Sequence, residues 1–336
     1  MSIPKQELQQ IPHLNAEALG GRVVNLMALW DGERWHSWVP VGDKVVKMQM
    51  VDISEGLYLA KAAVRPADLF IPFVDLMWQR ASWPEIVPLL SAICDDFRNM
   101  GTSIAKLRHV FQTRHLLASG AAREFAATEL EYLVILARTI FDLLQEMMSK
   151  IWHQRVRLND QAAETLRKQR KLPDTFSSLC LEEKRRVRTV EEIESRFGLP
   201  RVLAEQYAAA APFFCELRKI RDGIVHSGKE FDLIFETERG FCVSPKSAPF
   251  SAFQWQTHHS YNENLVSLLP WLSHIILQTI GTCTALMSAF ASLISLPEEL
   301  APGYRVFVRG PNNDALIQVL EIQHGASPWW GPSGSQ

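Results

Sequence analysis

Short segments in which hydrophobic and polar residues alternate predict strands in the first quarter of the chain. Asp31-Gly32-Glu33 separates two of these segments, and the glycine supplies the positive φ that a hairpin turn requires. Several prolines after residue 65 end the pattern. We therefore expect a small β-rich domain over residues 1–80, with strands at Arg22–Trp30, Arg34–Val39, Lys44–Val51 and Leu57–Ala63.

From about residue 85 the apolar positions recur at intervals of three and four residues, the spacing of one face of an α-helix. The repeat is clearest over 121–156. Gly198-Leu199-Pro200 interrupts it, and a further helix then runs from about Arg201 to His226. Pro212 either kinks this helix or begins a separate one, and Gly228 is suited to end it.

A hairpin, an uncharged helix and two C-terminal strands complete the predicted order. The hairpin occupies 231–244, and the strands Tyr304–Arg309 and Ala315–Ile322, within 300–324, could return to the N-terminal sheet. The pattern indicates a mainly α fold. We expect an up-and-down helical bundle over residues 85–297 beside the β-rich domain, and a disordered tail over 325–336.

The composition narrows the class of protein. The formal net charge of −2 excludes a chain-wide nucleic-acid-binding surface, so RNA would need a local basic patch. Five scattered cysteines form no C-x-x-C pair, which favours a reducing compartment. The N-terminus lacks the apolar core of a signal peptide. We therefore expect a cytoplasmic protein.

One uncharged stretch could instead be a helix that crosses a membrane. Residues Asn264–Pro297 carry no charge and are long enough to cross a bilayer. However, they contain Pro270, His274 and Gln278 and are not flanked by basic residues. We therefore expect a buried helix and no membrane contact, with a membrane-associated protein as the alternative.

The clearest chemical motif is Arg221-Asp222-Gly223-Ile224-Val225-His226. Cleavage of RNA by its own 2′-hydroxyl needs a base, an acid and positive charge on the phosphate. Histidine can serve as base or acid near neutral pH, and arginine offers a planar fork to phosphate oxygens. His226 would thus transfer protons, Arg221 would bind the scissile phosphate, and Asp222 would position the site.

The spacing of the motif matters for this chemistry. On an α-helix Arg221 and His226 diverge by roughly 140° and are separated by a rise of about 7.5 Å. A single helix therefore holds half of a site. A homodimer that presents both copies to one groove would complete it.

Other charged residues could support the motif. Arg138 and Asp142 lie four residues apart in an apolar helix; they are either a self-contained ion pair, or Asp142 orients the motif while Arg138 adds positive charge. A basic run over 150–188 is either an RNA-tracking surface or a solvated helix face. The candidate RNA-binding residues are Arg218, Lys184, Arg185 and Arg186.

The helical core with Arg221, Asp222 and His226 resembles the HEPN superfamily, the "higher eukaryotes and prokaryotes nucleotide-binding" domains. Their signature is Arg, a polar residue, three residues and His late in a bundle helix. The resemblance covers about residues 85–297. It implies a dimeric, metal-independent endoribonuclease that needs no cofactor and leaves 2′,3′-cyclic phosphate and 5′-hydroxyl ends. It further implies a role in toxin–antitoxin or antiphage systems, with the β-rich ends as sensor modules or as sites for an inhibitory protein.

Two less specific interpretations of these residues remain. Arg218 and Asp222 have the spacing of an ordinary surface ion pair, and His226 that of an ordinary helix end. A non-catalytic HEPN-like scaffold that binds RNA or a protein is therefore the alternative function. His258-His259 with Cys242 is a weak suggestion of a metal site, and we expect none.

Overall fold

The computed structural model describes residues 3–158, 161–183, 186–227, 231 and 233–331. A six-stranded mixed sheet has the order β3-β2-β1-β4-β11-β5. Only β1 and β4 are parallel among its adjacent strands, and the others pair antiparallel. Its strands are β1 (Ala28–Trp30), β2 (Trp35–Val41), β3 (Lys44–Met50), β4 (Gly56–Ala60), β5 (Leu69–Phe70) and β11 (Arg305–Arg309).

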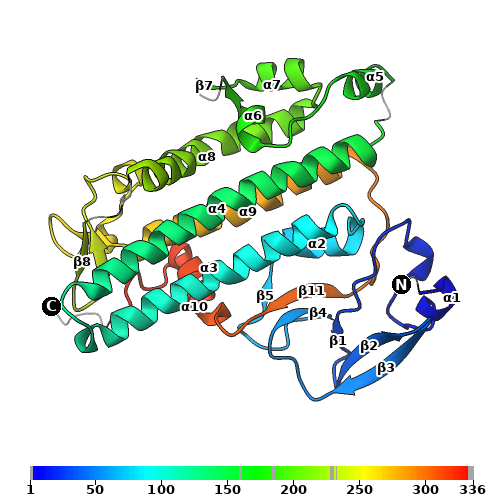
Figure 1. Cartoon of the computed structure of the whole chain (residues 1–336), viewed down its shortest axis with the longest axis horizontal. Helices are drawn as coiled ribbons and strands as arrows, with labels where there is room; N and C mark the ends of the chain where they lie inside the picture. The colour runs from blue at the N-terminus through cyan, green and yellow to red at the C-terminus, as the bar shows by residue number, and fades with distance from the viewer. Residues whose placement is uncertain (1–2, 159–160, 184–185, 228–230, 232, 332–336) are drawn as a thin grey trace.

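Helices stack on this sheet in successive layers, as Figure 1 shows. The layer nearest the sheet contains α2 (Pro72–Arg80) and α3 (Val87–Thr113). Above it lie α4 (Ala121–Gln154) and α9 (Leu269–Leu293), and α8 (Arg201–Ser227) packs on both. The short α10 (Asn313–Leu320) packs against α3 and α9.

Small elements cover the ends of the long helices. The short helices are α1 (Lys5–Leu8), α5 (Gln161–Gln169), α6 (Phe176–Cys180) and α7 (Val190–Phe197). The single 3-10 turns are η1 (Ala16–Ala18), η2 (Arg114–Leu116), η3 (Phe250–Ala252), η4 (Thr257–His259) and η5 (Glu321–His324). The remaining strands are β6 (Leu181–Glu182) with β7 (Arg186–Val187), and β8 (Ile234–Glu236), β9 (Phe241–Val243) and β10 (Val266–Ser267) in a small sheet.

The expected mainly α class is wrong. About 53% of the described residues are helical and 13% are in strands, and the helices lie over a mixed sheet of six strands in an α/β arrangement rather than forming an up-and-down bundle. The reason is tertiary packing. Sheet residues such as Leu29 and Val306 belong to the same hydrophobic core as the long helices, so the sheet is a layer of one structure rather than a separate domain beside a bundle.

The C-terminal segment decides this architecture. As expected, the segment around Tyr304–Arg309 returns to the N-terminal sheet, where β11 lies between β4 and β5. Within it Arg309 is buried, and its Nη2 lies 2.6 Å from Oδ2 of Asp68. The expected strand at Ala315–Ile322 is instead α10 followed by η5, because its apolar residues face α3 and α9 along one helical side.

The chain end that was expected to be disordered packs on the molecule as far as residue 331. Trp329 is buried and lies under the guanidinium of Arg239, 4.3 Å from the carbon to the ring centre. Ser267 donates a hydrogen bond to the carbonyl of Pro328. Residues 332–336 lie outside the described residues.

Helix α9 has the length and composition of a membrane-crossing helix, and it was the one such helix found in the described residues. Many of its apolar residues, Trp271 and Leu272 among them, are buried, and the helix packs against α2, α4, α8 and α10. The core helix of a soluble protein passes the same test. The molecule is globular, and α9 contributes to its continuous hydrophobic core.

Candidate functional site

Helix α8 carries the motif and is continuous from Arg201 to Ser227. Pro212 lies inside it with an exposed ring and begins no separate helix. The preceding break is fixed by Gly198, which ends α7 with a φ of +67°; a Cβ there would lie 3.0 Å from Leu166. Gly228, expected to end α8, lies outside the described residues.

Asp222 holds two guanidinium groups near the end of α8. Its Oδ1 lies 3.2 Å from Nη1 of Arg221, and its Oδ2 lies 3.5 Å from Nε of Arg218. Both arginines are partly exposed, with 36% of the Arg221 side chain open to solvent. The ordinary ion pair between Arg218 and Asp222 therefore exists, and Asp222 also contacts the motif arginine.

Arg138 and Asp142 lie beside this group, on the side of α4 that packs against α8. Nη1 of Arg138 is 2.7 Å from Oδ2 of Asp142, so the ion pair exists within α4. Arg138 is buried over the ring of Phe214 at 4.4 Å, and its Nε makes no hydrogen bond to a described residue. Burial lowers the pKa of Arg138, and repulsion from Arg221 and Arg218 adds to this effect against the pull of Asp142.

These five side chains form what we call the α4–α8 charge cluster: Arg138, Asp142, Arg218, Arg221 and Asp222. It combines three guanidinium groups with two carboxylates, so its formal charge is +1. Guanidinium groups next to a helix end can bind a phosphate when they outnumber the carboxylates around them.

His226 lies apart from the cluster in the last turn of α8 and is exposed. No hydrogen bond or ion pair joins it to another described residue. Because α8 is continuous, the roughly 140° divergence of Arg221 and His226 holds. Within one chain the arginine and the histidine are thus not brought together.

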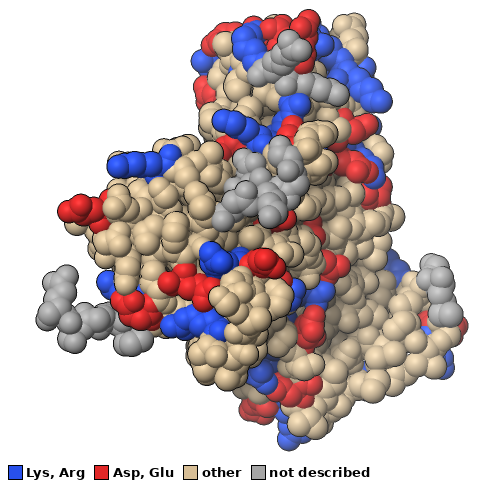
Figure 2. Space-filling model, turned by 60° about the vertical axis from the view of Figure 1, so that its left-hand side comes forward, with Lys and Arg blue, Asp and Glu red and all other residues tan. Residues whose placement is uncertain are grey.

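The other candidate RNA-binding residues are less available. Lys184 and Arg185 lie outside the described residues. Arg186 is held by two carboxylates, with Nη2 2.6 Å from Glu182 and 2.5 Å from Glu192. Figure 2 shows basic and acidic atoms interleaved over the upper part of the molecule, where α5, α6 and α7 lie, rather than one continuous basic surface.

The weak metal suggestion finds no support in the described part of the chain, where no group of three or more His, Cys, Asp or Glu side chains is placed to hold a metal ion. Sγ of Cys242 lies 3.7 Å from the hydroxyl of Thr237 in the small sheet. His258 and His259 belong instead to a cleft beside α8 and α9.

Sequence reasoning missed that cleft. It is lined by Glu216 of α8, five residues before Arg221, by His274 of α9, and by His259. The one sequence signal was His274, a lone histidine in an otherwise uncharged helix. No local sequence pattern indicates that it lies near η4. Tertiary packing brings these residues together.

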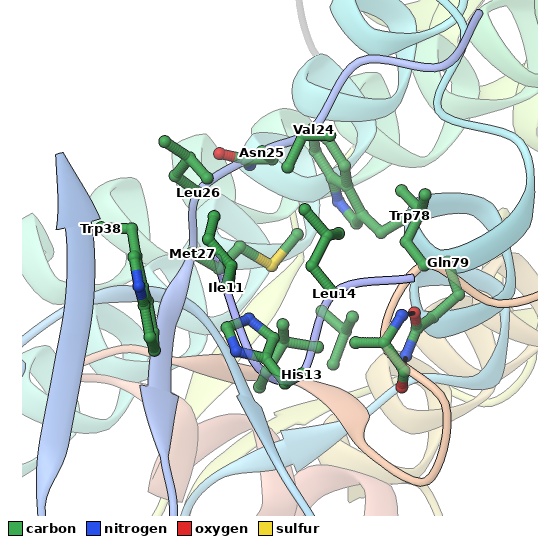
Figure 3. Close-up of a pocket in the computed structure, with 14 residues that line it drawn as sticks. Ile11, His13, Leu14, Val24, Asn25, Leu26, Met27, Trp38, Trp78 and Gln79 are labelled. Atoms are coloured by element: carbon green, nitrogen blue, oxygen red, sulfur yellow. Dashed lines mark hydrogen bonds between the residues drawn. The ribbon is translucent and has the colours of Figure 1, made fainter. Parts of the chain in front are cut away.

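A small apolar cavity of about 30 Å³ lies beneath the N-terminal segment, and sequence reasoning missed it too. Figure 3 shows the indole of Trp38 from β2 beside the imidazole of His13, with 4.7 Å between ring centres. Nδ1 of His13 is buried and makes no hydrogen bond to a described residue. Burial lowers the pKa of His13 to about 4.

In comparisons with known proteins, no family model, no curated protein and no solved structure matches this chain.

Proposed function

We propose that this protein is a metal-independent endoribonuclease of HEPN type, cytoplasmic and homodimeric, with its site at the C-terminal end of α8. The observation that supports this most is the α4–α8 charge cluster. The cluster contains three guanidinium groups and two carboxylates, and Arg221 within it is partly exposed. An exposed histidine follows one to two helical turns later.

In the proposed reaction the 2′-oxygen of RNA attacks the adjacent phosphorus, and the bond to the 5′-oxygen breaks. A base takes the 2′-hydroxyl proton and an acid gives one to the leaving 5′-oxygen, so the products are a 2′,3′-cyclic phosphate and a 5′-hydroxyl. In each site one His226 would act as the base that takes the proton from the 2′-hydroxyl and then as the acid that gives it to the leaving 5′-oxygen. Arg221 would bind the phosphate oxygens, while Asp222 would hold Arg221 in position.

The remaining support comes from the buried neighbours of the motif. Arg138 lies behind Arg218 and Arg221, and its repulsion favours an additional anion at the cluster. A bound phosphate would supply that negative charge. A toxin or antiphage role, regulated by an inhibitory protein, is the biological setting that the HEPN resemblance suggests.

The alternative is a non-catalytic RNA- or protein-binding scaffold. One observation favours it: Asp222 already neutralises part of the charge on both Arg218 and Arg221. A scaffold would keep RNA binding without cleavage.

The test is incubation of purified protein with total RNA in excess chelator, followed by mapping of the RNA ends. We expect cleavage by the wild type and a loss of at least about 100-fold in His226→Ala, since general acid–base catalysis contributes about 10²–10⁴-fold. Arg221→Ala should lose a comparable factor. His115→Ala, which removes an exposed histidine in η2, is the matched control and should cleave normally.

Two results would contradict this function. One is cleavage that requires a divalent metal. The other is cleavage that survives the combined loss of Arg221 and His226. RNA binding without cleavage by the wild type would support the scaffold instead.

A further inference from the structure

A second cleft, which we call the α8–α9 cleft, lies between these two helices and the segment that carries η3 and η4. Its volume is about 560 Å³, within the range of small-molecule sites. Figure 1 shows the η3–η4 segment (yellow) beside the C-terminal half of α8. Glu216, Phe253, His259, His274 and Gln323 line the cleft from different parts of the chain.

His259 lines the cleft, and its Nδ1 is occupied by a hydrogen bond. It is 5% exposed, and its Nδ1 accepts a hydrogen bond from the backbone N–H of Gln256 at 3.2 Å. Burial, with a smaller contribution from His258, lowers the pKa of His259 to about 4, so the ring is neutral at pH 7. A neutral ring that accepts at Nδ1 carries its proton on Nε2. That Nε2–H has no partner among the described residues.

Two further polar side chains in the cleft lack partners. Glu216 makes no hydrogen bond or ion pair to a described residue, and burial raises the pKa of its carboxyl group. His274 contacts the rings of Phe213 and Phe253 at 5.7 and 5.3 Å but makes no hydrogen bond within the described chain. Partly buried polar groups without partners cost free energy, which a ligand would recover.

The charge of the lining restricts the ligand. Among the described residues that line the cleft there is no Lys or Arg, so a phosphate has no cation to bind. The described residues also place no metal-binding group there. The ligand must therefore offer hydrogen-bond donors to a carboxylate, an acceptor to His259, and an apolar ring face to Phe253.

We propose that the α8–α9 cleft binds a guanine base of an RNA strand. Guanine presents N1–H and N2–H side by side to the carboxylate of Glu216, and its O6 accepts from Nε2–H of His259. Phe253 supplies the aromatic contact that unstacked bases use. Adenine, cytosine and uracil each lack this combination of two adjacent donors and a neighbouring acceptor.

This inference rests on the proposed function and gives that site a sequence preference. Glu216 precedes His226 by ten residues on one helix, about 15 Å along its axis and roughly 80° around it. A few nucleotides of single strand span that distance. A guanine in the cleft would therefore fix the position of the cut at the end of α8.

The direct test is isothermal titration of the full chain with the four nucleoside 5′-monophosphates. We expect GMP to bind about 5- to 150-fold more tightly than AMP, CMP or UMP, the range by which one bidentate base contact discriminates. Equal binding of all four nucleotides, or no binding of GMP at millimolar concentration, would overturn the proposal. Binding of the polyamine spermidine without binding of GMP would also overturn the proposal.

Glu216→Gln tests the contact that sets specificity. The amide keeps the shape of the side chain but replaces one acceptor by a donor, so GMP affinity should fall at least about fivefold. Glu205→Gln, on the exposed N-terminal part of α8, is the matched control and should bind GMP as the wild type does. Because Glu216 has no ion pair to a described residue that the substitution would break, the variant should unfold at or above the wild-type temperature, which separates lost binding from misfolding. Unchanged GMP affinity in Glu216→Gln would contradict the assignment.

The two proposals fail in different ways. GMP binding that persists in His226→Ala, in a wild type that does not cleave RNA, would keep the guanine site and remove the ribonuclease. Cleavage of RNA at positions with no guanine at a fixed distance from the cut would keep the ribonuclease and remove the guanine site.

Discussion

At the scale of single residues, the molecule keeps several polar side chains where their burial has a cost. Arg138 lies over Phe214 with one carboxylate beside it, and Glu216 has no partner among the described residues. Buried groups of this kind gather at functional sites, since a ligand supplies what the protein leaves unpaired. Arg138 of α4 lies against Phe214 of α8, and Glu216 belongs to α8 itself, which is the reason to place the chemistry along this helix.

His13 gives a prediction of acid sensitivity. Its pKa is lowered to about 4 by burial, against an ordinary 6.5, so the unfolded chain binds the proton first as the pH falls. The stability of the folded state is therefore lost between about pH 6.5 and pH 4. From pH 7 to pH 5 this loss is about 2 kcal/mol. His13→Leu should remove that part of the pH dependence in urea unfolding, whereas His115→Leu should leave it. If the free energy of unfolding fell with pH as steeply in His13→Leu as in the wild type, His13 would not be the source of this acid sensitivity.

At the scale of elements, close packing of helices matters more than local propensity. Gly101 of α3 is buried against α10, where a Cβ would lie 3.4 Å from the carbonyl of Asn312 and 3.5 Å from Cβ of Leu316. The segment predicted as a strand is held as α10 by this contact. Glycine is costly in a helix, and at this position a side chain larger than a methyl group would meet α10.

Gly101→Val should therefore lower the free energy of unfolding by about 1–3 kcal/mol, because the two added methyl groups meet α10. Gly101→Ala should be neutral or better, since one methyl group fits at ordinary contact distance and improves helix propensity by up to about 1 kcal/mol. Gly281→Val is the control, because a Cβ at this exposed position of α9 meets nothing within 4 Å. Denaturant unfolding of the three variants measures the differences. A tolerated Gly101→Val would show that α10 does not pack closely on α3.

At the scale of the whole molecule, the motif on α8 supplies only half of the proposed site. Arg221 interacts with Asp222 on one side of α8, and His226 lies on another. A dimer would bring the arginine of one chain to the histidine of the other.

Mixing two inactive variants tests this arrangement. When Arg221→Ala and His226→Ala chains exchange, each heterodimer keeps one site with both groups intact. Random exchange makes half of the dimers heterodimers, so about a quarter of wild-type cleavage should return. The readout is RNA cleavage before and after subunit exchange. Mixing each variant with itself is the control, and no recovery after proven exchange would rule out a shared site.

The sequence by itself determined the long helices and the place of the motif, because both depend on local spacing. The apolar repeat over 121–156 identified most of α4, and Gly198-Leu199-Pro200 marked the start of α8. The 140° divergence of Arg221 and His226 also followed from spacing alone.

Tertiary structure alone decided how the distant segments pack on one another. It placed β11 between β4 and β5, which made the fold a helix-covered mixed sheet rather than a bundle. It also brought Arg138 to the motif, and His259 and His274 to Glu216. The physical reason is that periodicity reports which face of an element is apolar, whereas the partner of that face depends on the packing of the whole chain.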